Sequence, residues 1–140
     1  MTSSNPTFFN GLTLFKKTLV NADGTGFVTV YTPAQLEKIE MLGASSDDTA
    51  ARDLLIAVQI GGTDYPICCI RLPIGAGTLG GATPGVPAID MLDVTQTPQC
   101  SRDENGKPYL LLDATCTIRA KVLVAVTAAK TVTIFGHAKK

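Results

Sequence analysis

The chain has 140 residues, the size of one ordinary domain with its own hydrophobic core. Twelve basic side chains balance twelve acidic ones, which argues against a nucleic-acid-binding protein because phosphate binding needs a basic excess. Only 17% of the residues are charged, while 45% are hydrophobic. A surface with so few charges indicates that another protein covers part of it.

The sequence shows no signal for a membrane or for export. No stretch approaches the roughly 18 to 20 consecutive apolar residues of a membrane-spanning helix. The N-terminal sequence MTSSNPTFFNG has no basic region followed by an apolar one, as a secretion signal would have. We therefore expect a soluble protein that is not exported and has no membrane partner.

The cysteines and the single histidine do not form a recognisable metal motif. Cys68, Cys69, Cys100 and Cys116 lack the spacing of metal ligands, so we expect them to be reduced and mostly buried. Neighbouring cysteines on one strand would point to opposite faces. Without a second histidine or a C-x-x-C pair, a zinc site is not expected. We expect His137, three residues from the C-terminus, to be solvated.

Short apolar or alternating runs recur along the chain between clusters of Gly, Pro, Asn and Asp, which is typical of an all-β sandwich or barrel. The pairs Asp23-Gly24, Gly61-Gly62 and Asn105-Gly106 suit tight turns. We predict about eight or nine strands, enough for two packed antiparallel sheets. The predicted strands are Leu12–Val20, Phe27–Thr32, 35–44, Asp53–Gly61, Tyr65–Leu72, Ala88–Val94, Tyr109–Ala114, Thr115–Val126 and Thr131–Gly136.

Residues 35–44 fit two patterns. Gln35, Leu36 and Glu37 are good helix formers, yet apolar and polar residues also alternate with a period of two. Pro33 and Gly43 leave about ten residues between breakers, a short span for an amphipathic helix and an ordinary one for a strand. We therefore predict a strand, a proline kink and a second strand.

Alternation also assigns residues to faces in the later runs. In Asp53–Gly61, one face carries Leu54, Ile56, Val58 and Ile60. In Thr115–Val126, one face carries Ile118, Ala120, Val122 and Val124, with Thr117, Arg119 and Lys121 opposite. The apolar faces are expected to form the core.

Two long segments without a strand pattern are predicted to be loops, the usual place for binding residues. Residues 95–108 are polar, and residues 73–87 are rich in glycine and proline. The second loop contains a literal G-x-G-x-x-G at Gly75, Gly77 and Gly80. A phosphate-binding loop must open a helix. The glycines and prolines that follow forbid one, so we interpret the segment as a surface loop.

No group of residues predicts catalysis or a cofactor. Asp103-Glu104-Asn105-Gly106 lacks the frame of a calcium-binding loop, and Asp47-Asp48 is ordinary turn chemistry. Asp90, Asp93 and Asp113 could supply paired carboxylates, but nothing in the sequence brings them together. His137 has no nucleophile motif as a partner. We therefore predict a protein that is not an enzyme and that holds no metal or cofactor.

The N-terminal segment concentrates aromatic residues. Phe8, Phe9 and Phe15 are three of the five phenylalanines, and they lie among Ser, Asn, Pro and Gly. We interpret residues 1–11 as an arm that docks on a neighbour, followed by a single β-sandwich domain over residues 12–140. The alternative is a disordered tail that happens to contain two phenylalanines.

The order of these features resembles that of small bacteriophage head decoration, or cement, proteins. The residues that carry the resemblance are GFVTVYTPAQLEKIEMLGAS, DLLIAVQIGGTDYPICCIRLPIGAGT, AIDMLDV, YLLLDATCTIRAKVLVAV and TVTIFGHA. The shared pattern is a strand that runs into Tyr-Thr-Pro, a second strand, a Gly-Gly hairpin, a Gly-rich loop with prolines and a late pair of strands. It covers roughly residues 15 to 137, and no family motif matches the loop at 95–108.

The resemblance implies a jelly-roll-like β-sandwich that binds the outer surface of the assembled capsid. It implies the major capsid protein as the partner, a homotrimer, and a virion assembled in the host cytoplasm. A tail or neck component and a receptor- or carbohydrate-binding module are the alternatives. We expect the arm and the Gly-rich loop to make the contacts. The candidate partner-binding residues are Phe8, Phe9, Leu12, Phe15, Ile74, Leu79 and Val86.

Overall fold

The structure, a computed structural model, describes residues 12–77, 87–92 and 100–140. They form an all-β fold with one 3-10 turn, η2 (Asn21–Asp23), and no α-helix within the described ranges. The strands are β1 (Leu12–Leu19), β2 (Val28–Tyr31), β3 (Glu37–Ser46), β4 (Arg52–Ile60), β5 (Thr63–Leu72), β6 (Ile89–Asp90), β7 (Ser101–Arg102), β8 (Pro108–Leu112), β9 (Cys116–Val122) and β10 (Val132–Lys139).

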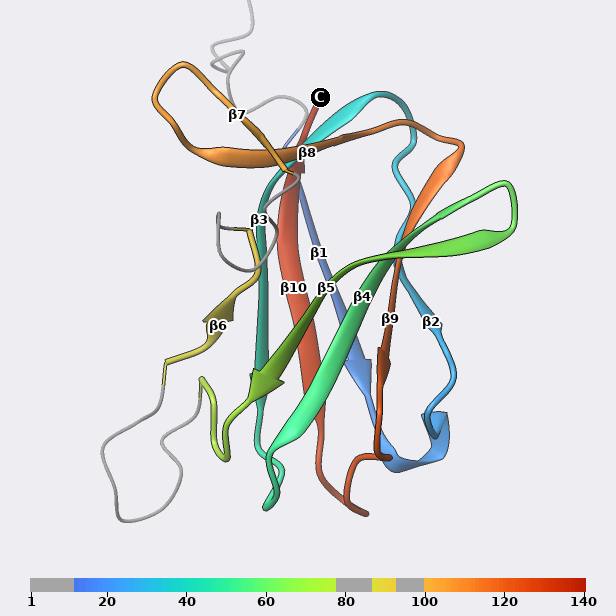
Figure 1. Ribbon diagram of the computed structural model, residues 1–140, viewed down its shortest axis with the longest axis vertical. Coiled ribbons are helices and arrows are strands. Elements are labelled where there is room, and N and C mark those ends of the chain that lie inside the picture. The colour runs from blue at the N-terminus through green and yellow to red at the C-terminus, as the bar shows by residue number, and fades with distance from the viewer. Residues whose placement is uncertain (1–11, 78–86, 93–99) are drawn as a thin grey trace, which may run out of the picture.

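The strands form two antiparallel sheets packed as a sandwich (Figure 1). Sheet A has the order β1-β10-β3-β8-β7, with β6 also paired to β3, and sheet B has the order β2-β9-β4-β5. The eight longer strands have the order of a jelly roll, β1-β10-β3-β8 facing β2-β9-β4-β5. The predicted fold class is thus confirmed. The strand count exceeds the prediction by one because β7, a two-residue strand, lies in a segment predicted to be a loop.

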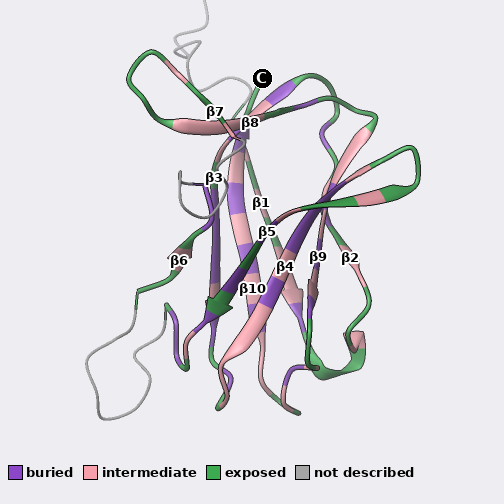
Figure 2. Ribbon diagram, in the orientation of Figure 1, coloured by how far each residue is buried: buried purple, intermediate pink, exposed green. Residues whose placement is uncertain are grey.

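The hydrophobic core lies between the two sheets, and Figure 2 shows buried residues along strands of both. Ile134 and Ile39 contribute from sheet A and Ile118 from sheet B, each with no exposed surface. Burying a side chain of this size stabilises the fold by about 1.5 to 3 kcal/mol. Val122 is also buried, as its position in the alternating pattern predicted.

The segment from β2 to β3 confirms the predicted strand, proline kink and strand. Glu37, the first residue of β3, is buried, and its carboxylate accepts hydrogen bonds from the Tyr31 hydroxyl (2.5 Å) and the Ala34 amide (3.2 Å). Burial, this hydrogen bond and the Glu37 charge together raise the pKa of Tyr31 to about 12. Glu37 therefore fixes the connection around Pro33.

Two predicted strands end earlier than expected. Of Ala88–Val94, only Ile89–Asp90 pairs with β3, and the next two residues are buried outside any strand. Residues 93 and 94 lie outside the described residues. The strand predicted to reach Val126 stops at Val122, although the Leu123 amide still donates a hydrogen bond to the Asp53 carbonyl of β4 (3.0 Å). Val124, predicted to be in the core, is 61% exposed.

Part of the predicted loop 95–108 is a hairpin. Ser101 and Arg102 pair with Tyr109 and Pro108, so this end of the segment extends sheet A. The Asn105-Gly106 turn is confirmed by a positive φ of 79° at Gly106. The sequence could not predict the two-residue strand because neither residue has an apolar pattern.

Gly136 on β10 occupies a site with no room for a side chain. A Cβ there would lie 2.2 Å from the Met41 carbonyl oxygen and 2.6 Å from the Phe15 ring. The Met41 backbone is held by the β-bulge between β3 and β10, so it cannot move aside easily.

We expect Gly136→Ala to lower the free energy of unfolding by roughly 1 to 3 kcal/mol, because overpacking forces the backbone to shift. Urea denaturation measures the change. The matched control is Gly26→Ala, where no atom lies within 4 Å of the added Cβ. Equal stability of the two variants would contradict the steric role of Gly136.

Candidate interaction surface

Three of the carboxylates considered for catalysis or metal binding accept hydrogen bonds from backbone amides of the turns in which they lie. Asp90 accepts a hydrogen bond from the Leu92 amide and Asp113 from the Thr115 amide. Asp103 accepts from the amides of Asn105 and Lys107 across the hairpin tip. Asp93 lies outside the described residues. In the described part of the chain, no three His, Cys, Asp or Glu side chains come together as a metal site would require.

The Gly-rich loop begins in turns. Gly75 and Gly77 have φ values of 72° and 76°, and the Ala76 carbonyl accepts a hydrogen bond from the Ser46 amide at the end of β3 (2.8 Å). A Cβ on Gly77 would lie 2.7 Å from the Ser45 Cβ, so the loop starts in close contact with β3. Gly80 lies outside the described residues.

A buried ionic cluster joins the β3–β4 turn to the segment before β10. Asp48 has a fully buried carboxylate that accepts hydrogen bonds from Arg52 Nε (2.7 Å) and from the hydroxyl (2.6 Å) and amide (3.0 Å) of Thr127. Burial, the largest influence, raises the pKa of Asp48, but these hydrogen bonds outweigh it and hold the pKa well below its ordinary value. The cluster is fully satisfied, which identifies it as structural.

Two expectations for individual side chains are wrong. Only Cys68 among the cysteines is buried, whereas Cys69, on the opposite face of β5, is exposed. Cys100 and Cys116 are half-buried, and none of the four cysteines forms a disulfide, as expected. His137 is not solvated: it is half-buried in β10, because pairing with β1 and β3 places it inside sheet A.

The outer face of sheet B carries two ion pairs and a cation–π contact. Arg71 and Asp53 form a two-bonded ion pair at 3.0 Å, and Arg119 contacts Asp64 at 3.2 Å. The ammonium of Lys121 lies 4.8 Å from the centre of the Phe27 ring. Such a face is suited to exposure to solvent.

The outer face of sheet A is different. β1, β10 and β3 point apolar side chains away from the core, in register with one another: Leu14 pairs with His137, which pairs with Met41. Leu14 is 75% exposed, Leu12 45% and Met41 37%. We call Leu12, Leu14, Met41, Phe135 and His137 the apolar face.

Two hollows flank Phe135 on the apolar face. One, of about 210 Å³, is bordered by Met41, Ala88 and Ile89, and the other, of about 460 Å³, by Leu14, Lys16 and Met41. Gly43 makes room for the ring, since a Cβ there would lie 2.8 Å from it. A small-molecule site needs converging polar groups. The side chains around these hollows are mostly apolar, so they suit the side chains of another protein.

His137 adds a polar atom to the apolar face. Its Nδ1 is buried and has no hydrogen-bond partner among the described residues. A buried polar atom without a partner costs free energy that a hydrogen bond would recover. His137 Nδ1 is therefore an unsatisfied polar group within the apolar face.

The structure separates the predicted partner-binding residues. Leu12 lies on the apolar face, and Ile74 is 58% exposed at the start of the Gly-rich loop. The Phe15 side chain does not lie on the apolar face. It points inward and stacks on Tyr31 across the sandwich, with ring centres 4.5 Å apart. Phe8, Phe9, Leu79 and Val86 lie outside the described residues.

The described residues next to the predicted contact segments nevertheless border one surface. Residues 1–11 precede Leu12 at one edge of the apolar face, while the ends of the Gly-rich loop, Ala76–Gly77 and Ala88, lie beside β3 at the other. Sequence reasoning missed Leu14, Met41, Phe135 and His137. The available signal was that β1 and β10 carry apolar residues on both faces, in LTLF and TIFGHA.

Comparisons with known proteins give no family. No family model matches the chain, and no curated protein matches it by sequence. One similar solved structure is the Drosophila NLP core, described for pentamer formation and histone binding, with 12% identity, a TM-score of 0.44 and coverage of 92% of this chain and 97% of that one. Another is a chain of the cyanophage Pam1 capsid asymmetric unit, with 13% identity, a TM-score of 0.45 and coverage of 99% and 93%. Likenesses at this level carry no argument about function.

The described residues include no helix that is long and apolar enough to cross a membrane.

Proposed function

We propose that the protein is a non-enzymatic structural protein of a phage virion, a decoration protein that binds the outer surface of the assembled head. The observation that carries the proposal is the apolar face on sheet A, set against the ion-paired outer face of sheet B. An exposed apolar sheet face with hollows is a surface for another protein. The sequence resemblance to head decoration proteins supports the major capsid protein as that partner.

The proposed mechanism is stabilisation by selective binding. A protein that binds across neighbouring capsid subunits adds its binding energy to the cost of separating them. A homotrimer would engage several sites at once, so a modest interface would give firm attachment. The chain would join the exterior of the capsid in the host cytoplasm, and no catalytic turnover is needed.

Capsid melting tests the stabilising role. Expanded capsids that lack the protein should release their DNA at a lower temperature than the same capsids saturated with it. The shift should grow with occupancy, because only bound copies oppose subunit separation. A release temperature that does not change at full occupancy would contradict the proposal.

We expect deletion of residues 2–11 to spare folding but to weaken capsid attachment. The deletion leaves every described core residue in place, since Phe15 and Leu19 are the first of them along the chain, whereas Phe8 and Phe9 are proposed to bury apolar surface on a partner. Thermal melting checks the fold and sedimentation with capsids checks attachment. Unchanged attachment would refute the role of the arm.

The carbohydrate-binding alternative is not favoured. Such modules stack sugars on clustered aromatic rings, and the three tyrosines lie apart. Tyr31 stacks on Phe15 in the interior, Tyr109 lies under Lys38, and Tyr65 is exposed on β5.

A further inference from the structure

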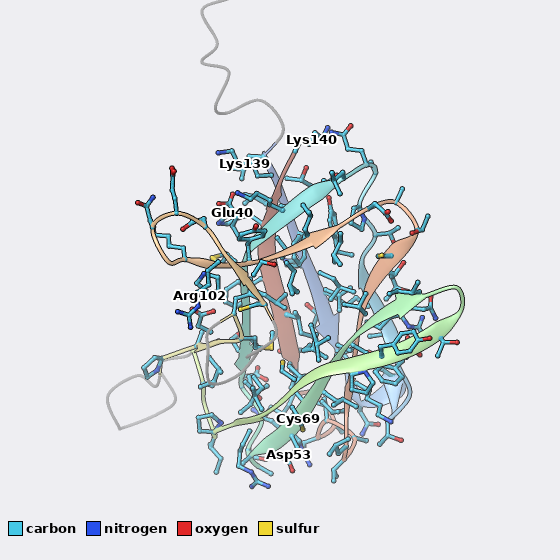
Figure 3. All side chains as sticks on the ribbon, turned by 45° about the horizontal axis from the view of Figure 1, so that its top comes forward. Glu40, Asp53, Cys69, Arg102, Lys139 and Lys140 are labelled. Atoms are coloured by element: carbon cyan, nitrogen blue, oxygen red, sulfur yellow. The ribbon has the colours of Figure 1, made fainter. Side chains whose placement is uncertain are left out.

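Lysines that form no ion pair with another described residue lie around the apolar face. Lys16 on β1 and Lys139 on β10 are exposed, and Lys140 follows at the end of the chain. Figure 3 shows Lys139 and Lys140 at the end of the molecule opposite Asp53. The ion pairs found within the described ranges all lie elsewhere, two on sheet B and one at Asp48.

Few carboxylates offset these cations. Glu40 on β3 and Asp90 on β6 are the acidic residues beside the apolar face, and one Asp90 oxygen already accepts the Leu92 amide. Lys38 lies over the Tyr109 ring and close enough to Asp103 to interact with its charge, so it is not counted with these cations. Lys16, Lys139 and Lys140 therefore stand against Glu40 and Asp90 around the apolar face. The chain as a whole is neutral, so this excess is local.

We infer that the apolar face binds a protein surface whose apolar side chains are bordered by carboxylates. The inference rests on the proposed function, in which that surface belongs to the capsid exterior. Charges at the rim of an interface steer association and select partners, while the apolar centre supplies most of the affinity. The basic rim and apolar centre on sheet A are complementary to such a partner.

The same arrangement disfavours a second copy of this chain as the occupant. In a two-fold contact through the apolar face, the rim of one copy, with its excess of lysines, would meet the same rim of the other copy, and an excess of like charge across an interface is repulsive. The hollows beside Phe135 are shaped to receive the side chains of a protein rather than a lipid surface.

Two matched pairs of variants test the inference by sedimentation with expanded capsids. Lys16→Glu reverses a rim charge, and Lys121→Glu makes the same change on sheet B. Leu14→Ser removes an apolar contact, and Leu123→Ser makes the same change at a residue that is 47% exposed outside the apolar face. All four positions are partly or largely exposed, and thermal melting checks that each variant folds.

We expect Lys16→Glu and Leu14→Ser to lower capsid affinity by roughly five- to tenfold, with the controls within about twofold of the natural chain. The Lys16 effect should shrink as salt is raised, because exposed charges are screened. Capsid binding that all four variants leave unchanged would overturn this inference and leave the proposed function standing. No binding by the natural chain would overturn both.

Two further measurements test whether a membrane or a second copy of the chain, rather than another protein, binds the apolar face. Vesicles with phosphatidylserine should not bind the natural chain; binding that Lys16→Glu abolishes would assign the face to membranes and overturn the inference. Light scattering should show the same oligomeric state for the natural chain and Leu14→Ser. Dissociation caused by Leu14→Ser would assign the face to self-association instead.

Discussion

Replacing Val122 with aspartate is expected to unfold the domain. Val122 is 2% exposed on β9 and faces Leu54, itself fully buried, on β4. A carboxylate there would be buried without a partner, at a cost of several kcal/mol, and the packing of the valine would be lost as well. Since a domain is stable by only about 5 to 15 kcal/mol, this loss removes much or all of its stability.

Circular dichroism during thermal unfolding measures the effect. The matched control is Leu123→Asp at the next residue, which is 47% exposed and lies outside β9. We expect the control to melt close to the natural chain. A cooperative melt of Val122→Asp at the same temperature would show that the core does not lie where the structure places it.

Asp48→Ala is expected to lower the free energy of unfolding by about 3 to 5 kcal/mol, the usual cost of removing one partner from a buried ion pair. The Asp48 side chain is fully buried and that of Arg52 is 11% exposed. The substitution leaves the Arg52 charge without its carboxylate and removes two hydrogen bonds to Thr127. Urea denaturation gives the change.

The control is Asp47→Ala, one residue away. Asp47 is exposed and accepts a hydrogen bond from the Thr131 amide (2.7 Å), so its loss should cost only about 0.5 to 1.5 kcal/mol. If both alanine variants lost the same small amount, the buried cluster would not contribute as described.

Asp48 also predicts how stability depends on pH. Its folded pKa lies well below the ordinary value of about 3.9, so the folded state favours the ionised carboxylate. The contribution of Asp48 is therefore complete above about pH 4 and is lost as the pH falls below that value toward the folded pKa. Asp48→Asn should weaken the loss of stability between about pH 4 and pH 2; an unchanged acid profile would contradict this.

The sequence was sufficient for the fold class because its signals are local. Alternation and turn residues mark most strands, and the choice of strand over helix for β3 is correct, although Gly43, interpreted as a breaker, lies inside β3. Strand order is not a local property: β1 pairs with β10, joining Leu12 to Lys139 at the opposite end of the chain. A list of strands cannot contain that pairing.

The candidate surface depends on the same long-range pairing. The sequence shows Leu14, Met41 and His137 as separate residues, and only the order β1-β10-β3 makes them neighbours on one face. Asp48 is a similar case, since its partner Thr127 is 79 residues away and nothing in Ser-Ser-Asp-Asp points to it. Phe15 was assigned to the surface because its partner across the sandwich, Tyr31, is equally invisible in the sequence.

Sedimentation of the purified protein with expanded capsids that lack it tests the central claim most directly. The proposed function predicts saturable binding with a fixed ratio of this chain to major capsid protein. Failure to co-sediment at any concentration up to saturation of the assay, with a folded protein, would contradict it.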